Sequence, residues 1–346
     1  MKLYKHIAAA LCALSLWGTA AAASPLEETY TTLPLKQVKA EGTLIFSDCP
    51  EYANTPGILY EGTVSKGKGR LYYYHVNELG APARLVVYAR AKKPQTIHLK
   101  RAIKGDASAD YIPTGSTLSF REAVDRGQKE ISISLPAKGR TIIFEDNAAG
   151  IRPKDLVSGL VEIEVEKPVT LGAAIFPFDD DRTIRENLET ASRLPADEHE
   201  MRGTFASDIY LESDAWDFRK GNADIVIGTS FPFQKGRDEM SAADRENTGD
   251  YGITYHMRIP TKGEGKYRLY INPMGGVYTG SFQIGQHENL LRLYRTDNIR
   301  NRALFGHGTT DDYMEAGTWE SGRGLFIRFI PAGATYLPIR FLLVKE

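Results

Sequence analysis

The sequence has few of the residues that build redox, metal or covalent catalytic sites. It contains two cysteines. Cys12 lies in an apolar N-terminal run, so an exported chain would retain Cys49 alone and could form no internal disulfide. The seven histidines are scattered singly, without an HxH, HExxH or CxxC motif. GxSxG, P-loop and GxGxxG motifs are also absent. The sequence therefore predicts no metal centre, no cofactor and no recognised catalytic motif.

Long hydrophobic runs are missing as well. The longest begins after Lys2 and Lys5, and covers Ile7 to Trp17, about eleven residues, short of the roughly 20 that cross a bilayer. Small residues end it, with Ala21-Ala22-Ala23 before Ser24. This pattern predicts a signal peptide over residues 1–23 and no membrane span in the mature chain. We expect a secreted, periplasmic or cell-surface protein.

An excess of either charge is lacking too. The chain has 43 Lys and Arg against 44 Asp and Glu, a formal net charge of −1. Loss of the predicted signal peptide removes two lysines and no acids, so the mature chain is slightly negative. Nothing in this balance favours nucleic acid or anionic lipid as a partner.

What the sequence does contain is a series of short alternating strands separated by turns. Examples are Thr43–Ser47, Gly57–Val64 and Arg70–Asn77, with the turn Ser65–Gly69 between the last two. Strands at this spacing, without helix-length patterns between them, predict an all-β fold made of two antiparallel β-sandwich-like domains. One short helix is predicted over Ser116–Arg126, capped by Ser116.

A polar, partly helical connector is predicted between the two domains. The segment opens with Asp179, Asp180 and Asp181, which suit a helix N-terminus better than a calcium loop, and Pro195 is expected to stop the helix. The predicted division is a signal peptide over 1–23, an N-terminal linker over 24–40, a β-sandwich over 41–177, a connector over 178–204 and a β-rich domain over 205–346.

Within the second domain, residues 266–284 predict a β-hairpin. Tyr267, Leu269 and Ile271 alternate with polar residues, and Gly275 and Gly276 supply the positive φ of a tight reversal. Residues 233–250 are polar and predict an insertion or mobile loop with a functional surface. Residues 290–302 fit a helix stripe or a strand equally well.

Three stretches of the sequence carry a resemblance to a known group of proteins: LIFSDCPEYANTPGILYEGTV and GRLYYYHVN, between Glu41 and Asn77, and the later INPMGGVYTG. They resemble exported bacterial proteins that are assigned to a copper amine oxidase domain family. The Asn-Tyr-Asp/Glu site of a tyrosine-derived quinone and paired copper-ligating histidines are absent from this sequence. The resemblance therefore implies an envelope β protein without the oxidase activity.

Two functions of different class stay open at this point. The first is a non-enzymatic module that binds a cell-wall polymer, a glycan or an envelope protein. Its candidate contacts are aromatic residues on strands and turns: Tyr72, Tyr74, Trp216, Tyr270 and Trp319. The second is a carbohydrate-active hydrolase with a carboxylate pair that no motif marks.

Overall fold

The computed structural model describes residues 24–346 except 126, 128, 230, 297–305 and 307–308. The predicted signal peptide lies outside the described residues. The all-β prediction is confirmed, since strands dominate and the described residues contain two α-helices, α1 (Tyr111–Val124) and α2 (Asp181–Thr190). Neither helix is long and apolar enough to cross a membrane.

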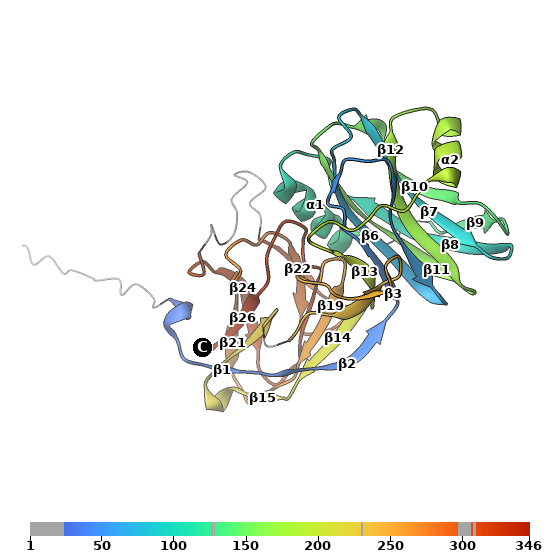
Figure 1. The fold of residues 1–346 in the computed structure, drawn as a ribbon. Helices are drawn as coiled ribbons and strands as arrows, with labels where there is room; N and C mark the ends of the chain where they lie inside the picture. Colours follow the sequence, from blue (N-terminus) through green and yellow to red (C-terminus); the bar gives the residue numbers. More distant parts are fainter. Residues whose placement is uncertain (1–23, 126, 128, 230, 297–305, 307–308) are drawn as a thin grey trace, which may run out of the picture.

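The first half of the chain builds most of a two-sheet sandwich, the N-terminal sandwich (Figure 1). One sheet has nine strands, in the order β18 (Ala243–Glu246), β17 (Lys235–Asp238), β13 (Arg202–Phe205), β3 (Thr43–Ser47), β6 (Gly67–Asn77), β11 (Leu156–Val165), β8 (Gln95–Lys104) and β9 (Ile131–Leu135), with β4 (Tyr52–Ala53) beside β6. The other has β10 (Thr141–Ile151), β7 (Ala83–Ala91), β12 (Val169–Pro177) and β5 (Gly57–Val64). We call the nine-stranded sheet the central sheet.

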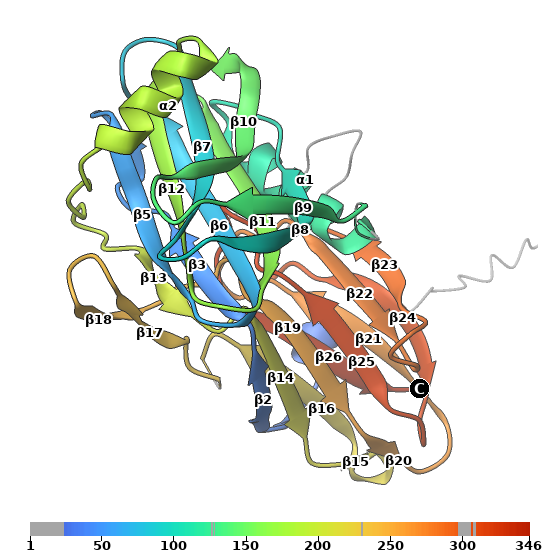
Figure 2. The same cartoon turned by 90° about the vertical axis from the view of Figure 1, so that its right-hand side faces the viewer.

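The second half builds most of the C-terminal sandwich, which lies below the first in Figure 2. Its five-stranded sheet runs β1 (Tyr30–Thr32), β16 (Asn222–Ile227), β26 (Ile339–Lys345), β21 (Lys266–Asn272) and β24 (Met314–Glu320). Its six-stranded sheet runs β2 (Leu35–Glu41), β14 (Asp208–Ser213), β19 (Thr254–Ile259), β25 (Leu325–Phe329), β22 (Ser281–Gly285) and β23 (Arg292–Arg295). A small ribbon joins β15 (Trp216–Asp217) and β20 (Thr261–Lys262). Most strand pairs are antiparallel, but β3 with β6 and β14 with β19 are parallel, so the sheets are mixed.

The central sheet is covered on both faces because successive side chains of β6 point to opposite sides. Leu71 and Tyr73 are buried in the core of the N-terminal sandwich. Tyr72 and Tyr74 point the other way, into a core that includes Tyr255 and Phe282 of the C-terminal sandwich. The two sandwiches therefore share a continuous hydrophobic contact through the far face of the central sheet.

A buried arginine reinforces this contact. Arg70 on β6 is fully buried, and its Nη1 donates to the carbonyl oxygens of Ser207 and Gly252, both at 2.8 Å. Its Nε and Nη2 donate to Glu162 on β11, at 2.9 and 2.7 Å. One side chain thus joins the central sheet to the backbone of the C-terminal sandwich.

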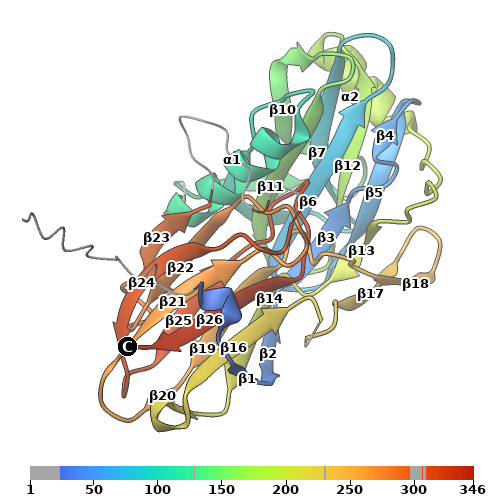
Figure 3. The same cartoon turned by 90° about the vertical axis from the view of Figure 1, so that its left-hand side faces the viewer.

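The N-terminal stretch 24–40, expected to be a linker, instead contains β1 and most of β2. Figure 3 shows both, in blue, beside strands of the C-terminal sandwich. β1 pairs with β16, and β2 pairs with β14. Segments from the beginning and the end of the chain thus build one sandwich. That the two predicted domains can fold separately stays a prediction.

The predicted hairpin over 266–284 is wrong in its pairing. β21 pairs with β24 and β26 in one sheet, whereas β22 pairs with β23 and β25 in the facing sheet. The alternation was read correctly, because Tyr267, Leu269 and Ile271 are fully buried. Gly276 has the expected positive φ of 86°. Gly275 does not, and it is required instead because a Cβ there would lie 2.5 Å from the carbonyl oxygen of Tyr336.

Three further expectations need correction. Helix α1 begins five residues before the predicted cap Ser116, which lies buried inside the helix. Helix α2 begins as predicted, with the Asp180 side chain accepting from two backbone N–H groups, but it ends at Thr190, before Pro195. The polar stretch 233–250 contains the paired strands β17 and β18 instead of a loop alone. It is also anchored to β13, since the fully buried Asp238 accepts from Arg202 at 3.0 Å. In the ambiguous stretch 290–302, residues 292–295 form β23 and 297–302 lie outside the described residues.

Candidate functional site

A cavity of about 530 Å³ opens where the two sandwiches meet, and tyrosines surround it. We call it the tyrosine pocket. Its lining comes from segments far apart in the chain: Asp48, Glu51, Tyr52, Tyr72, Tyr74, Tyr111, His199, Met201, Thr248, Tyr251, Gly333, Ala334 and Tyr336. Pockets of this size between domains are where small ligands most often bind.

The wall of the pocket is formed by the alternation of β6. Tyr72 and Tyr74 leave the same face of the strand, and both are buried. Gly333 lies against them, because a Cβ at that position would come within 2.7 Å of the Tyr74 ring. The Tyr251 hydroxyl donates to the carbonyl oxygen of Thr335 at 2.5 Å, which ties the segment before β19 to the segment before β26. The close approach of Gly333 and the hydrogen bond from Tyr251 to Thr335 therefore hold the segments before β19 and β26 against Tyr72 and Tyr74.

The rim of the pocket is accessible to solvent. Tyr52 is 45% exposed and Tyr336 is 58% exposed, although both are large aromatic residues. The pKa of Tyr111, which stands between wall and rim at the start of α1, is raised to about 12 by burial and by the neighbouring Tyr52. Its phenol is therefore protonated at neutral pH, and its hydroxyl is engaged with Tyr52 at the rim. An exposed aromatic rim above a buried aromatic wall suits a ligand of which one part is buried in the pocket and the rest stays in solvent.

Two carboxyl groups at the pocket lack a strong basic partner. Burial, and then the neighbouring Glu51 and Asp197, hold the pKa of Asp48 well above its usual range. Burial also raises the pKa of Glu51. The Oδ1 atom of Asp48 is out of contact with solvent and has no hydrogen-bond partner. Among the described lining residues there is no lysine or arginine, and His199 is the one basic side chain. Within the pocket, therefore, a carboxyl oxygen of Asp48 can still accept a hydrogen bond from a ligand.

The connector between the sandwiches is held against this site through Cys49. The Sγ of Cys49 donates to Asp197 Oδ1 at 3.1 Å and accepts from the Asp197 N–H at the same distance. Asp197 Oδ2 accepts from the Glu51 N–H at 2.8 Å. Burial and the Asp197 contact raise the pKa of Cys49 to about 12, so the thiol is not a nucleophile at neutral pH. Through these bonds the cysteine helps to position Asp197 at the start of the segment that leads to His199 and Met201 of the pocket.

The five predicted contact residues separate into two groups. Tyr72 and Tyr74 lie together in the tyrosine pocket. Trp216 and Trp319 are each 7% exposed in the C-terminal sandwich, and their Nε1 groups donate to the carbonyl oxygens of Gly221 and Ala316. Tyr270 is half-buried on β21, with its ring at the edge of Tyr313. The structure therefore does not bring these three residues to the pocket.

Most of the pocket was missed at the level of sequence. Tyr111, Tyr251 and Tyr336 come from a helix and two loops separated by more than eighty residues, so no local pattern connects them. The segment SDCPEY did carry a signal. It places Asp48, Glu51 and Tyr52 just after the end of β3, where side chains of a strand end meet those of the neighbouring strand.

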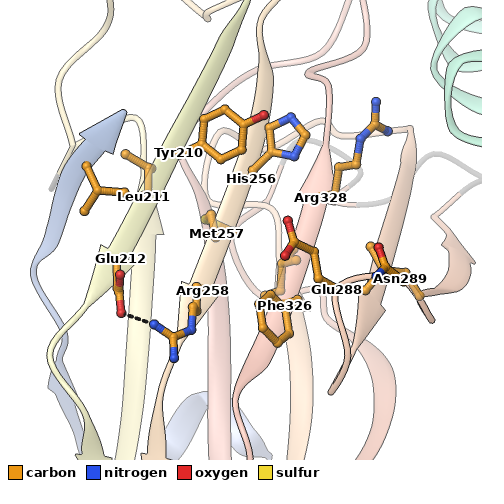
Figure 4. Close-up of a pocket in the computed structure, with 13 residues that line it drawn as sticks. Tyr210, Leu211, Glu212, His256, Met257, Arg258, Glu288, Asn289, Phe326 and Arg328 are labelled. Atoms are coloured by element: carbon orange, nitrogen blue, oxygen red, sulfur yellow. Dashed lines mark hydrogen bonds and ion pairs between the residues drawn. The ribbon is translucent and has the colours of Figure 1, made fainter. Parts of the chain in front are cut away.

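A second groove, of about 340 Å³, lies on the outer face of the six-stranded sheet (Figure 4). Tyr210 stacks on His256 with ring centroids 4.4 Å apart, and Arg258 donates to Glu212 at 2.6 Å. The imidazole Nε2 of His256 lies 3.1 Å from Asp208. Arg328 donates to Glu122. Since its basic side chains are already paired with acids of the protein, this groove offers less to a ligand than the tyrosine pocket.

Neither site shows the features of a metal centre, and no group of three or more His, Cys, Asp or Glu side chains among the described residues is arranged to hold a metal ion. What the tyrosine pocket can do chemically is bind: aromatic faces for apolar contact, phenols as donors and two carboxyl groups as acceptors.

Comparisons with known proteins give no family for the chain. No protein-family model matches the sequence, and no curated protein matches it. The CUB1-EGF-CUB2 domain of human MASP-1/3 is 10% identical, with 83% of this chain and 99% of that chain covered and a TM-score of 0.19. A Paenibacillus xanthan lyase is 12% identical, with 91% of this chain and 26% of that chain covered and a TM-score of 0.21. The CupB6 tip adhesin from Pseudomonas aeruginosa is 10% identical, with 87% of each chain covered and a TM-score of 0.17. These likenesses are too low to carry an argument about function.

Proposed function

We propose that this chain is a non-enzymatic binding module of the cell envelope, and that the tyrosine pocket holds part of a glycan. The observation that supports this most is the pocket itself, in which six tyrosines surround a cavity of about 530 Å³ together with two carboxyl groups. Tyrosine rings pack against the apolar C–H faces of a sugar, while phenols and carboxyl groups bond its hydroxyls. The predicted signal peptide and the resemblance of residues 41–77 to exported proteins support a location in the envelope.

Hydrolysis is the second candidate function. A glycosidase needs one protonated and one ionised carboxyl group, so the environments of the pair must push the two pKa values apart. Burial holds the pKa of Asp48 well above its usual range and raises that of Glu51 as well, so the two acids do not by themselves separate binding from hydrolysis. Analysis of the products after incubation with an oligosaccharide makes that separation.

The proposal is tested with the rim tyrosines Tyr52 and Tyr336. Because both are exposed, their replacement should cost little folding stability. Tyr52→Ala and Tyr336→Ala should each weaken binding of an oligosaccharide by about two- to twelvefold, since an aromatic contact contributes about 0.5–1.5 kcal/mol. Tyr270→Ala is the matched control, on β21 inside the five-stranded sheet and outside the lining of the pocket. Binding would be measured by calorimetry against β-1,4-linked tetrasaccharides.

Two outcomes contradict the proposal. If Tyr270→Ala abolishes binding while the rim variants keep it, the glycan site lies on the five-stranded sheet. If the tetrasaccharide is cleaved on incubation, as seen by chromatography of the products, the chain is a hydrolase.

A further inference from the structure

We infer that the glycan bound in the tyrosine pocket carries a positive charge, as an amino sugar with a free ammonium group does, and that Asp48 is its counter-ion. This inference rests on the proposed function, because it names the chemistry of the ligand for the same pocket. The geometry behind it is an acid placed in an aromatic cavity without a cationic partner of its own.

The first step is the state of Asp48. Its Oδ1 is withdrawn from solvent and has no hydrogen-bond partner in the protein. A buried carboxyl oxygen without a partner is costly, so such groups are rare unless a ligand completes them. Elsewhere in this protein buried acids do have partners: Glu162 pairs with Arg70 at 2.7 Å, and Asp238 pairs with Arg202 at 3.0 Å. Asp224 on β16 also has one oxygen without a partner, but its other oxygen accepts from Arg340 at 2.6 Å, whereas no basic side chain among the described residues pairs with Asp48.

The second step is the charge of the surroundings. The titratable groups that face Asp48 are Glu51 on the same loop and Asp197 on the connector, with His199 beside them. Both oxygens of Asp197 already accept from the Cys49 thiol and the Glu51 N–H. The remaining lining is uncharged and consists of six tyrosines with Met201, Thr248, Gly333 and Ala334. No described lining residue supplies a lysine or arginine, so no permanently charged cation of the lining opposes the entry of an ammonium group.

The third step is the tyrosine rings. An aromatic face attracts a cation through its quadrupole, and the attraction grows when the cation leaves water. A cavity lined by both aromatic rings and a carboxylate therefore selects an ammonium group over a hydroxyl of the same size. The groove of Figure 4 lacks this selectivity, because Arg258 and Arg328 are part of its lining.

Binding of an ammonium group should also move a proton. Burial and neighbouring acids favour the protonated form of Asp48 in the empty pocket. A bound cation favours the ionised form, so the carboxyl proton should be released on binding. The observed enthalpy of binding should then depend on the ionisation enthalpy of the buffer. A neutral sugar should show no such dependence.

The deciding experiment uses three tetrasaccharides with the same β-1,4 backbone and different substituents at C2. These are glucosamine, N-acetylglucosamine and glucose tetramers, titrated into the full chain at about pH 6, below the pKa of a typical amine. The glucosamine tetramer should bind at least about tenfold more tightly than the other two. Asp48→Asn keeps the shape but removes the charge, and it should bring the three affinities to within about twofold of one another. Asp214→Asn, whose side chain is 79% exposed and ion-paired with Lys36, is the matched control and should keep the preference.

The outcomes separate this inference from the proposed function. If the three tetrasaccharides bind equally well, the pocket binds glycans but the ligand is not selected by charge, and the inference is overturned. If the preference survives in Asp48→Asn, the counter-ion is a different group, and the assignment of Asp48 is overturned. If no tetrasaccharide binds, the proposed function fails as well. The comparison among ligands on the wild-type chain needs no variant, so it holds even where Asp48→Asn folds poorly.

Discussion

Replacement of Arg70 by methionine should remove a large part of the stability of this protein. The guanidinium donates to the carbonyl oxygens of Ser207 and Gly252, to the Thr254 hydroxyl at 3.0 Å and to Glu162. Methionine fills similar space with an apolar chain and takes this donor from the Gly252 carbonyl and from Glu162 Oε1, while the Ser207 carbonyl keeps the Thr254 N–H and Glu162 Oε2 keeps Arg101. Removing one partner of a buried ion pair costs about 3–5 kcal/mol, and each orphaned buried acceptor about 1–3 kcal/mol, though these costs are not additive. Against a typical total of about 5–15 kcal/mol, we expect a loss of at least about 3 kcal/mol.

Urea unfolding followed by two signals measures this loss. Trp216 and Trp319 both lie in the C-terminal sandwich, so tryptophan fluorescence of the mature chain reports that sandwich, while far-ultraviolet circular dichroism reports both. In the wild type the two signals should change together, because the core is continuous through the central sheet. In Arg70→Met the midpoint should fall, and the signals should separate if Arg70 holds the sandwiches together.

The control is Arg219→Met. Arg219 also pairs with an acid, Asp217, but its side chain is 81% exposed, and surface pairs of this kind contribute little. Its midpoint should match the wild type. A midpoint for Arg70→Met that also matches the wild type would refute the reasoning, because it would mean that the buried acceptors find other partners at no cost.

Three further predictions follow from single residues. Burial lowers the pKa of His75 to about 4, so the unfolded chain takes up a proton first as the pH falls. Stability should therefore be lost between about pH 6.5 and 4, by up to about 3 kcal/mol. The pKa of Asp250 is raised to about 6, so protonation of Asp250 stabilises the folded chain over the same pH range and partly masks the effect of His75. The contribution of His75 is therefore measured as the difference in the free energy of unfolding between the wild type and His75→Gln at each pH. Gly159→Ala should destabilise by about 1–3 kcal/mol, because its Cβ would lie 2.1 Å from the Tyr73 hydroxyl and 2.4 Å from the ring carbon that bears it. The added loss should shrink in a Tyr73→Ala background, and an undiminished loss there would contradict the clash. Trypsin should cut the connector at Arg193, 53% exposed, before the buried Arg202, and first cleavage within residues 71–87 would argue against an exposed connector.

The faces of strands could be predicted from the sequence, but their partners could not. A two-residue period says which side chains are buried, and it was right for Tyr267, Leu269 and Ile271. It does not say whether β22 returns beside β21 or crosses to the facing sheet, since both arrangements bury the same residues. That choice depends on β24, β25 and β26, which are contributed by later parts of the chain.

The candidate site was predictable to the same extent. Alternation along β6 places Tyr72 and Tyr74 on one face, and both line the pocket. Trp216 and Trp319 were expected to be contacts because of their type, yet their size favours the core, where each finds a carbonyl oxygen for its N–H. The raised pKa of Asp48 arises from burial created by the second sandwich, which no local pattern of residues around position 48 contains.

The position of β1 and β2 has a consequence for how the protein is made. Both strands end by residue 41 and are therefore among the first parts of the chain to be synthesised. Their pairing partners, β16 for β1 and β14 for β2, follow more than 160 residues later. The C-terminal sandwich can therefore close only when nearly the whole chain has been synthesised, and early strands spend that time with unpaired edges. Expression of residues 205–346 alone would leave β14 and β16 as open edges on the same side of the sandwich, and we expect such a fragment to aggregate. A stable fragment would need residues 30–41 supplied again, by fusion or as a separate peptide that completes both sheets.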